Sequence, residues 1–193
     1  MQGICCITKS NRGVDRSTIR KVVGISSKSS SCLAQIETKK SENLRVTSIV
    51  IHGNIDKKSL EKGRVLGSSV CFARDLGNHP ANILTPTYLS KSAKMIAESS
   101  PKMECHVFDI NECKKMGMGA FYGVAQGAKE PAKMIIVEYN GGRKSQKPIA
   151  LVGKGLTFDA GGISIKPAPR MDEMKFDMCG SATVMGVLQA VSI

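Results

Sequence analysis

The chain has 193 residues, of which 41% are hydrophobic and 23% are charged. These are ordinary globular values, so they exclude wholesale disorder and allow one sizeable domain, or one domain with part of another. The net charge is +12, and the first 70 residues carry 13 Lys and Arg against 5 Asp and Glu. This basic first third could contact the phosphates of a nucleic acid, although a lysine-rich surface facing water explains the same charge.

The cysteines and the apolar runs indicate in which cellular compartment the protein is expected. The seven cysteines are odd in number and form no Cys-x-x-Cys pair, which favours reduced thiols over a disulfide framework or a zinc knuckle. The start, MQGICCITKS, lacks the apolar core of a signal peptide. No run approaches the ~18 apolar residues of a membrane span. We therefore expect a cytoplasmic protein with no membrane contact.

The first elements are expected from local patterns. Arg45–Asn54 has the β-branched density of a strand. Apolar and small residues then recur at helical spacing from Ser59 to Asp75. A second helix is expected to begin at Pro86, since proline suits the first helical position and Thr85 can cap it.

The remainder of the chain alternates strands with helices. We expect strands at Glu104–Asp109, Ala132–Tyr139 and Ile149–Gly155, with helices at Asn111–Met116 and Asp177–Val191. Such alternation predicts an α/β fold with a mixed central sheet flanked by helices. Because the aromatic share is only 4% and there is no Trp, the core must be built from Val, Ile, Leu, Met and Ala.

The stretch GKGLTFDAGGISIKP holds the first candidate functional residues. Lys154 follows a strand, and functional groups collect at the carboxyl ends of strands in open α/β sheets. Gly155 stands where a phosphate-binding loop requires Ser or Thr, so that motif is rejected. Lys154 could still simply point into water. Asp159 precedes glycines that allow a close turn, and Lys166 follows.

A metal site is one use for such residues. Asp177 opens the last expected helix in MKFDMCGSA, whose small residues permit close packing against a neighbouring element. Carboxylates with a lysine can hold a divalent metal without histidine. A lysine ligates only when it is neutral, which burial and the charge of a metal both favour. A second lysine that stays charged could stabilise a developing oxyanion.

Two long motifs carry a family resemblance. VGKGLTFDAGGISIKP and MDEMKFDMCGSATVMGV closely resemble the leucyl (cytosol) aminopeptidase family of two-metal exopeptidases. ARDLGNHPANILTPTYL and GMGAFYGVAQGA are similar to that family as well, so that the resemblance runs from about Gly67 to Val191. It implies that residues 66–193 are the N-terminal portion of a metallo-aminopeptidase catalytic domain. Residues 1–65 would then be a remnant of the family's N-terminal α/β domain with a linker.

The resemblance also implies a role for each matching residue. Lys154 matches a lysine metal ligand, and Asp159 matches the aspartate that bridges both metals. Asp177 matches a ligand of the ion that also takes the substrate amine. Lys166 matches the catalytic lysine that binds the substrate and stabilises the oxyanion of the tetrahedral intermediate. Met174 matches a methionine of the substrate side-chain pocket, although a core-packing methionine remains an alternative.

The cofactors, partners and completeness of the chain follow from the same resemblance. It implies two divalent ions per subunit (Mn²⁺ or Zn²⁺), a bicarbonate in the full-length family, peptide substrates with a free N-terminus and a leucine-like first residue, and a homo-hexamer. The family's later NTDAEGRL-like motif, which supplies further ligands and an arginine, does not occur in these residues. We therefore expect a truncated or partial chain with weak or no activity. The alternatives are a non-catalytic remnant and a basic nucleic-acid-binding segment.

Overall fold

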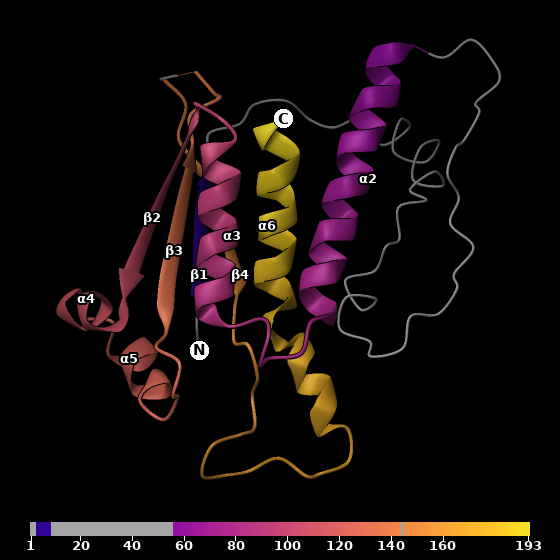
Figure 1. Cartoon of the computed structure of the whole chain (residues 1–193). Coiled ribbons are helices and arrows are strands. Elements are labelled where there is room, and N and C mark those ends of the chain that lie inside the picture. The colour runs from indigo at the N-terminus through magenta and orange to yellow at the C-terminus, as the bar shows by residue number, and fades with distance from the viewer. Residues whose placement is uncertain (1–2, 9–55, 144) are drawn as a thin grey trace.

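The structure, a computed structural model, describes residues 3–8, 56–143 and 145–193. The strand expected at Arg45–Asn54 and most of the basic first third lie outside these residues. The described strands form one mixed sheet in the order β2-β3-β1-β4 (Figure 1). Their bounds are Gly3–Thr8 for β1, Met103–Asp109 for β2, Lys133–Tyr139 for β3 and Ile149–Lys154 for β4.

The sheet places an N-terminal strand between two strands that follow one another in the sequence. β1 runs parallel to β3 and antiparallel to β4, while β2 runs antiparallel to β3. The register sets Gly3 opposite Lys154 and Ile4 opposite both Ile135 and Gly153. The expected strands β2, β3 and β4 are confirmed to within one residue at each end. The strand β1 was not predicted.

The helices confirm most of the remaining expectations. Their bounds are Lys57–Asn78 for α2, Pro86–Glu98 for α3, Ile110–Lys115 for α4, Gly119–Ala125 for α5, Met171–Met178 for the 3₁₀-helix η3 and Cys179–Ser192 for α6. The expected helix at Asp177–Val191 was placed two residues too early, because Asp177 lies in η3 and α6 begins at Cys179. The short helix α5 was not predicted.

Side-chain caps explain where three helices begin. The Thr85 hydroxyl accepts the amide hydrogen of Tyr88 at 3.2 Å, and Pro86 takes the first position of α3, as predicted. The Asp56 carboxylate accepts the amide hydrogen of Ser59 at 2.9 Å at the start of α2, and this bond lowers the pKa of Asp56. A capping box starts α4, since the side chains of Asp109 and Glu112 each accept the other residue's backbone amide.

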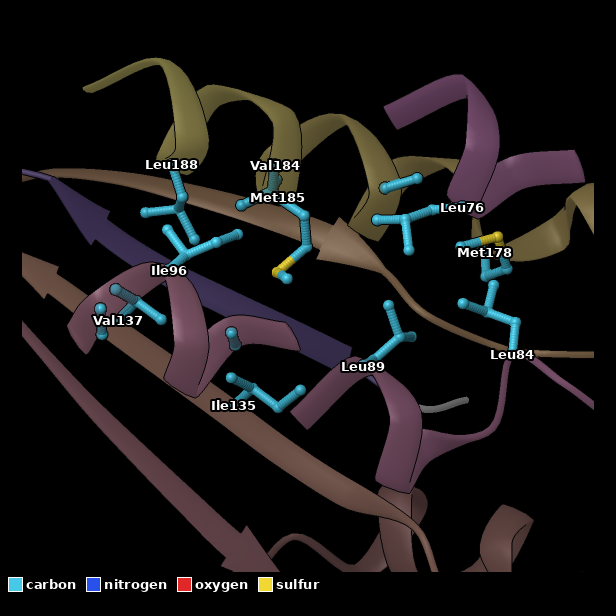
Figure 2. Packing of buried hydrophobic residues seen from close by; sticks show 13 residues of the cluster. Leu76, Leu84, Leu89, Ile96, Ile135, Val137, Met178, Val184, Met185 and Leu188 are labelled. Atoms are coloured by element: carbon cyan, nitrogen blue, oxygen red, sulfur yellow. The ribbon is translucent and has the colours of Figure 1, made fainter. Parts of the chain in front are cut away.

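The helices α3 and α6 lie side by side over one face of the sheet and enclose the core (Figure 1). Ile135 and Val137 of β3 point towards them, and Leu89, Met185 and Leu188 project from the helices (Figure 2). All five are at most 2% exposed. The core therefore consists of aliphatic side chains and methionine, as the composition predicted.

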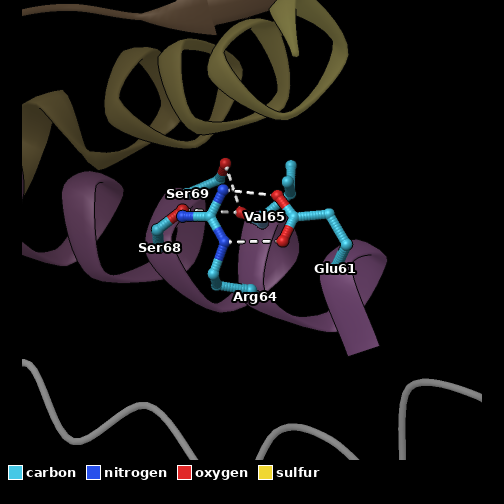
Figure 3. A network of polar contacts seen from close by, with 5 residues as sticks. All are labelled: Glu61, Arg64, Val65, Ser68 and Ser69. Atoms are coloured by element: carbon cyan, nitrogen blue, oxygen red, sulfur yellow. Dashed lines mark hydrogen bonds and ion pairs between the residues drawn. The ribbon is translucent and has the colours of Figure 1, made fainter. Parts of the chain in front are cut away.

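The helix α2 packs mainly on α6 and η3, outside the sheet layer. Figure 3 shows polar contacts along it: Arg64 pairs with Glu61, and the hydroxyls of Ser68 and Ser69 both donate to the Val65 carbonyl oxygen. The helix α2 runs through residues 65 and 66, and β1 belongs to the same sheet as β2, β3 and β4. The expected boundary between residues 1–65 and 66–193 stays a prediction. None of the described helices combines the length and apolarity needed to cross a membrane.

Candidate active site

The first pair of candidate residues joins two elements that are distant in the sequence. Lys154 is the last residue of β4, and Asp177 lies near the end of η3. The Lys154 Nζ donates to Asp177 Oδ1 at 2.6 Å. The side chain of Asp177 is only 20% exposed, so its contact with the lysine is partly shielded from water.

The second pair lies within the loop that connects β4 to η3. The Lys166 Nζ lies 3.2 Å from Asp159 Oδ2. The other carboxylate oxygen of Asp159 accepts the amide hydrogen of Gly161 at 2.9 Å, and the Lys166 amide donates to the Ala160 carbonyl oxygen. Gly161 and Gly162 both have positive φ, so the close turn expected after Asp159 is confirmed.

Several neighbouring groups lower the pKa of Asp159. The hydrogen bond from the Gly161 amide and the adjacent Lys166 ammonium lower the pKa of Asp159. The charge of Lys154 also lowers this pKa, with the smallest effect of these groups. The structure therefore pairs Lys154 with Asp177 and Lys166 with Asp159, and the charge of Lys154 acts on Asp159 as well.

One oxygen of this group is left without a partner. Asp177 Oδ2 is buried and makes no hydrogen bond to the described residues. A buried carboxylate oxygen with no partner is costly, and a cation would satisfy it. The described residues contain no cluster of three or more His, Cys, Asp and Glu side chains that could hold a metal ion, so an ion bound by Asp177 would need a further donor, and the Lys154 nitrogen is the one that contacts it. This donor set is compatible with Mn²⁺ or Zn²⁺.

Two further residues lie in η3 or at its start. Met174 lies in η3 three residues before Asp177 and is partly buried; its role as a pocket residue stays a prediction. Arg170, which precedes η3, has a φ of 65° and pairs with Glu173 at 3.1 Å. The sequence offered no signal for Arg170, because arginine seldom adopts the left-handed conformation.

A groove in the described part of the chain lies away from these residues. It has a volume of about 590 Å³ and runs between α2 and α6, lined by residues such as Val70, Ala73 and Val187. None of the four charged residues of the candidate site lines it.

Comparison with known proteins identifies the family. A sequence profile described as the catalytic domain of the cytosol aminopeptidase family matches residues 71–193. The chain belongs to the cytosol aminopeptidase family. All four charged candidate residues and Met174 fall within the matched region, so the family resemblance expected from the two glycine-rich motifs is confirmed.

Individual members of the cytosol aminopeptidase family are closely similar. A probable cytosol aminopeptidase of Alkalilimnicola ehrlichii is 50% identical over 135 residues, which are 70% of this chain and 27% of the relative. A probable cytosol aminopeptidase of Legionella pneumophila is 44% identical over 162 residues, which are 83% of this chain and 33% of the relative. The chain thus spans about a third or less of the relatives that it matches.

A solved structure supports the fold assignment. The bottromycin maturation enzyme BotP, in complex with Mn, is 27% identical and has a TM-score of 0.56, over 70% of this chain and 29% of that chain. The mixed α/β fold, with a small sheet and flanking helices, is therefore shared with part of this enzyme.

Proposed function

We propose that this chain carries part of the metal centre of a metal-dependent aminopeptidase that releases N-terminal amino acids, preferably leucine, from peptides. The proposal rests on one observation above all: Lys154 at the end of β4 pairs with Asp177, and Lys166 pairs with Asp159 in the loop that follows β4. Family membership adds the reaction class, since the relatives are named as probable cytosol aminopeptidases.

The metal-binding part of the proposal concerns three side chains. Lys154, Asp159 and Asp177 would hold divalent ions, and the unpartnered Oδ2 of Asp177 supports this assignment. The similarity to BotP, which was solved with Mn, is consistent with manganese. A pair of divalent ions, when bound, lowers the pKa of water and polarises a carbonyl group.

The substrate-binding part concerns the residues around the metal. Lys166 would remain charged and stabilise the negative charge that develops on the scissile carbonyl oxygen, because a fixed cation is most effective where charge appears in the transition state. Asp177 would lie close to the free amine of the substrate. Met174 would contact the first side chain, and this contact would favour leucine.

The finer parts of the proposal follow the family resemblance. We propose two ions per subunit, either Mn²⁺ or Zn²⁺, with a bicarbonate in the full-length family, and a cytoplasmic homo-hexamer. These 193 residues contain only part of the implied ligand set. We therefore expect this chain alone to hydrolyse a leucine chromogenic amide weakly or not at all.

The test measures metal binding by titration calorimetry with Mn²⁺ and hydrolysis of leucine p-nitroanilide. Asp177→Asn removes a charged ligand with little change in shape, and we expect Mn²⁺ affinity to fall by at least about tenfold, since even outer-shell changes at metal sites cost that much. Asp172→Asn is the matched control, because Asp172 also lies in η3 but is exposed and outside the charged cluster.

Two results would count against the proposal. Equal Mn²⁺ affinity in Asp177→Asn and the unaltered chain would remove Asp177 from the metal centre. Turnover by the 193-residue chain at the rate of a full-length relative would refute the expectation of weak activity, although it would support the reaction class.

A further inference from the structure

Two glycines meet where β4 ends beside the start of α6. A Cβ atom built on Gly153 would lie 2.6 Å from the Gly180 carbonyl oxygen and 2.7 Å from the Ser181 Cα. A Cβ atom built on Gly180 would lie 2.8 Å from the Lys154 amide nitrogen. Non-bonded atoms of this kind prefer separations of about 3.5–4.0 Å. Neither position therefore has room for a side chain.

Backbone conformation does not explain these two glycines. Among the described residues, glycines with positive φ occur only at Gly117, Gly161 and Gly162, so Gly153 and Gly180 have φ angles that alanine also adopts. Gly180 lies in the first turn of α6, where alanine would favour the helix more than glycine does. The contact between the two backbones is the remaining physical reason for glycine at both positions.

The surroundings leave the backbone little freedom to move. Ser181 and Met178 are both fully buried, and the Ser181 hydroxyl donates to the Met178 carbonyl oxygen at 2.7 Å. The atoms that an added Cβ would meet are main-chain atoms and not the ends of flexible side chains. A side chain at either glycine would thus push β4 and α6 apart.

The contact lies directly beside the Lys154–Asp177 pair. Lys154 follows Gly153 in β4, and Asp177 precedes Gly180 by less than one helical turn. We propose that Gly153 and Gly180 are positioning residues: their backbone contact fixes the separation of β4 and α6 and so holds Lys154 within reach of Asp177. The consequence for metal binding rests on the proposed function, whereas the consequence for the ion pair does not.

The expected size of the effect follows from the distances. Relief of a 2.8 Å contact requires a shift of roughly 0.7–1.2 Å, which exceeds the tolerance of about 0.5 Å that a functional site allows. Since the Lys154 Nζ to Asp177 Oδ1 distance is 2.6 Å, such a shift would lengthen it to about 3.3–3.8 Å, beyond the usual range of this hydrogen bond.

The experiment compares Gly180→Ala and Gly153→Ala with Gly186→Ala. Gly186 is a matched control in the same helix: a Cβ there would lie 3.0 Å from the Ser69 carbonyl oxygen and the Ala73 Cβ, so it faces α2 instead of β4. The first measurement is the NMR signal of the Lys154 ammonium group in the metal-free chain, since an ion-paired ammonium exchanges its protons slowly. The second is Mn²⁺ affinity by calorimetry, and the third is the urea midpoint of unfolding.

We expect the Lys154 ammonium signal to disappear or shift in Gly180→Ala and Gly153→Ala but to persist in Gly186→Ala. Mn²⁺ affinity should fall by at least about tenfold in the first two variants only. An unchanged signal in folded Gly180→Ala would overturn the inference, as would equal loss in Gly186→Ala. If Gly153→Ala does not fold, Gly180→Ala decides the question, because alanine suits a helix.

The proposed function and the positioning role can fail separately. A chain that binds no Mn²⁺ but loses the Lys154 signal in Gly180→Ala would refute the metal centre and support the positioning role. If the unaltered chain and Gly180→Ala bind Mn²⁺ equally well and the ion pair is intact in both, the positioning role is refuted and the metal centre is supported.

Discussion

The two lysine–aspartate pairs of the site are built in different ways. Lys154 and Asp177 are 23 residues apart, meet at 2.6 Å and come from β4 and η3. Lys166 and Asp159 belong to a single loop, lie 3.2 Å apart and rely on a turn made by Gly161. The first pair therefore depends on how the sheet packs against α6, whereas the second depends on local backbone conformation. A change to the packing should break one pair and leave the other.

The largest effect is expected from removal of residues 1–8. Because β1 pairs with β3 on one side and β4 on the other, its loss leaves two strand edges without hydrogen bonds. Each lost bond is worth about 0.5–1.5 kcal/mol, so the sum is comparable with a total stability of about 5–15 kcal/mol. We expect cooperative unfolding to be lost, as measured by circular dichroism in urea.

A point substitution tests the same strand with less disturbance. Cys5→Pro removes a backbone donor in the middle of a sheet and should lower the urea midpoint strongly, while Cys5→Val keeps a strand-forming residue and serves as the control. If the shortened chain and Cys5→Pro both unfolded at the original urea concentration, β1 would not be a central strand of the folded molecule.

The same contrast explains which parts of the molecule were predictable from the sequence. The turn after Asp159 and the start of α3 at Thr85 and Pro86 were predicted because each depends on neighbouring residues. The strand β1 was missed, since its pairing with Ile135 and Lys154 is set more than a hundred residues away. The packing of small residues near Gly180 was predicted, but its partner, the backbone of β4, was not.

The residue at which α6 begins could not be predicted from the spacing of apolar residues. Met171, Met174 and Met178 recur at helical spacing in η3 and lead into the apolar and small residues of α6, so this spacing does not reveal where 3₁₀ geometry becomes α-helical. The expected helix consequently included Asp177. Its carboxylate instead belongs to the tighter helix, where three residues per turn give it a different direction from the one that an α-helix would.

An intermediate effect, confined to the loop pair, is expected from Gly161→Ala. Gly161 has a φ of +90°, and a Cβ there would lie 2.4 Å from the Ser164 carbonyl oxygen. The variant should lose the bond from the Gly161 amide to Asp159 and should be destabilised by more than the ~1–2 kcal/mol that a left-handed alanine costs. The amide exchange rate of residue 161 and the urea midpoint measure the two effects.

Gly162→Ala tests the cost of the left-handed backbone conformation in that loop without adding a steric clash. Gly162 also has positive φ, at +66°, but no atom lies within 4 Å of its added Cβ, so this variant should cost only about 1–2 kcal/mol. In both variants the Lys154 ammonium signal should persist, because β4 and α6 are untouched. Loss of that signal in Gly161→Ala would show that the two pairs are not independent.

The smallest effect is expected at Arg170, which lies between the loop and η3. Its φ of 65° is unfavourable for any residue with a Cβ, whereas its pairing with Glu173 is an exposed contact worth at most ~1 kcal/mol. A glycine at this position would relieve the backbone but lose the pair, so Arg170→Gly should change stability little, while Arg170→Ala should lose the pair and keep the strain. We therefore expect Arg170→Gly to be more stable than Arg170→Ala by about 1 kcal/mol, measured as the difference in free energy of unfolding in urea. Equal stability of the two variants would mean that residue 170 does not hold the left-handed conformation in solution.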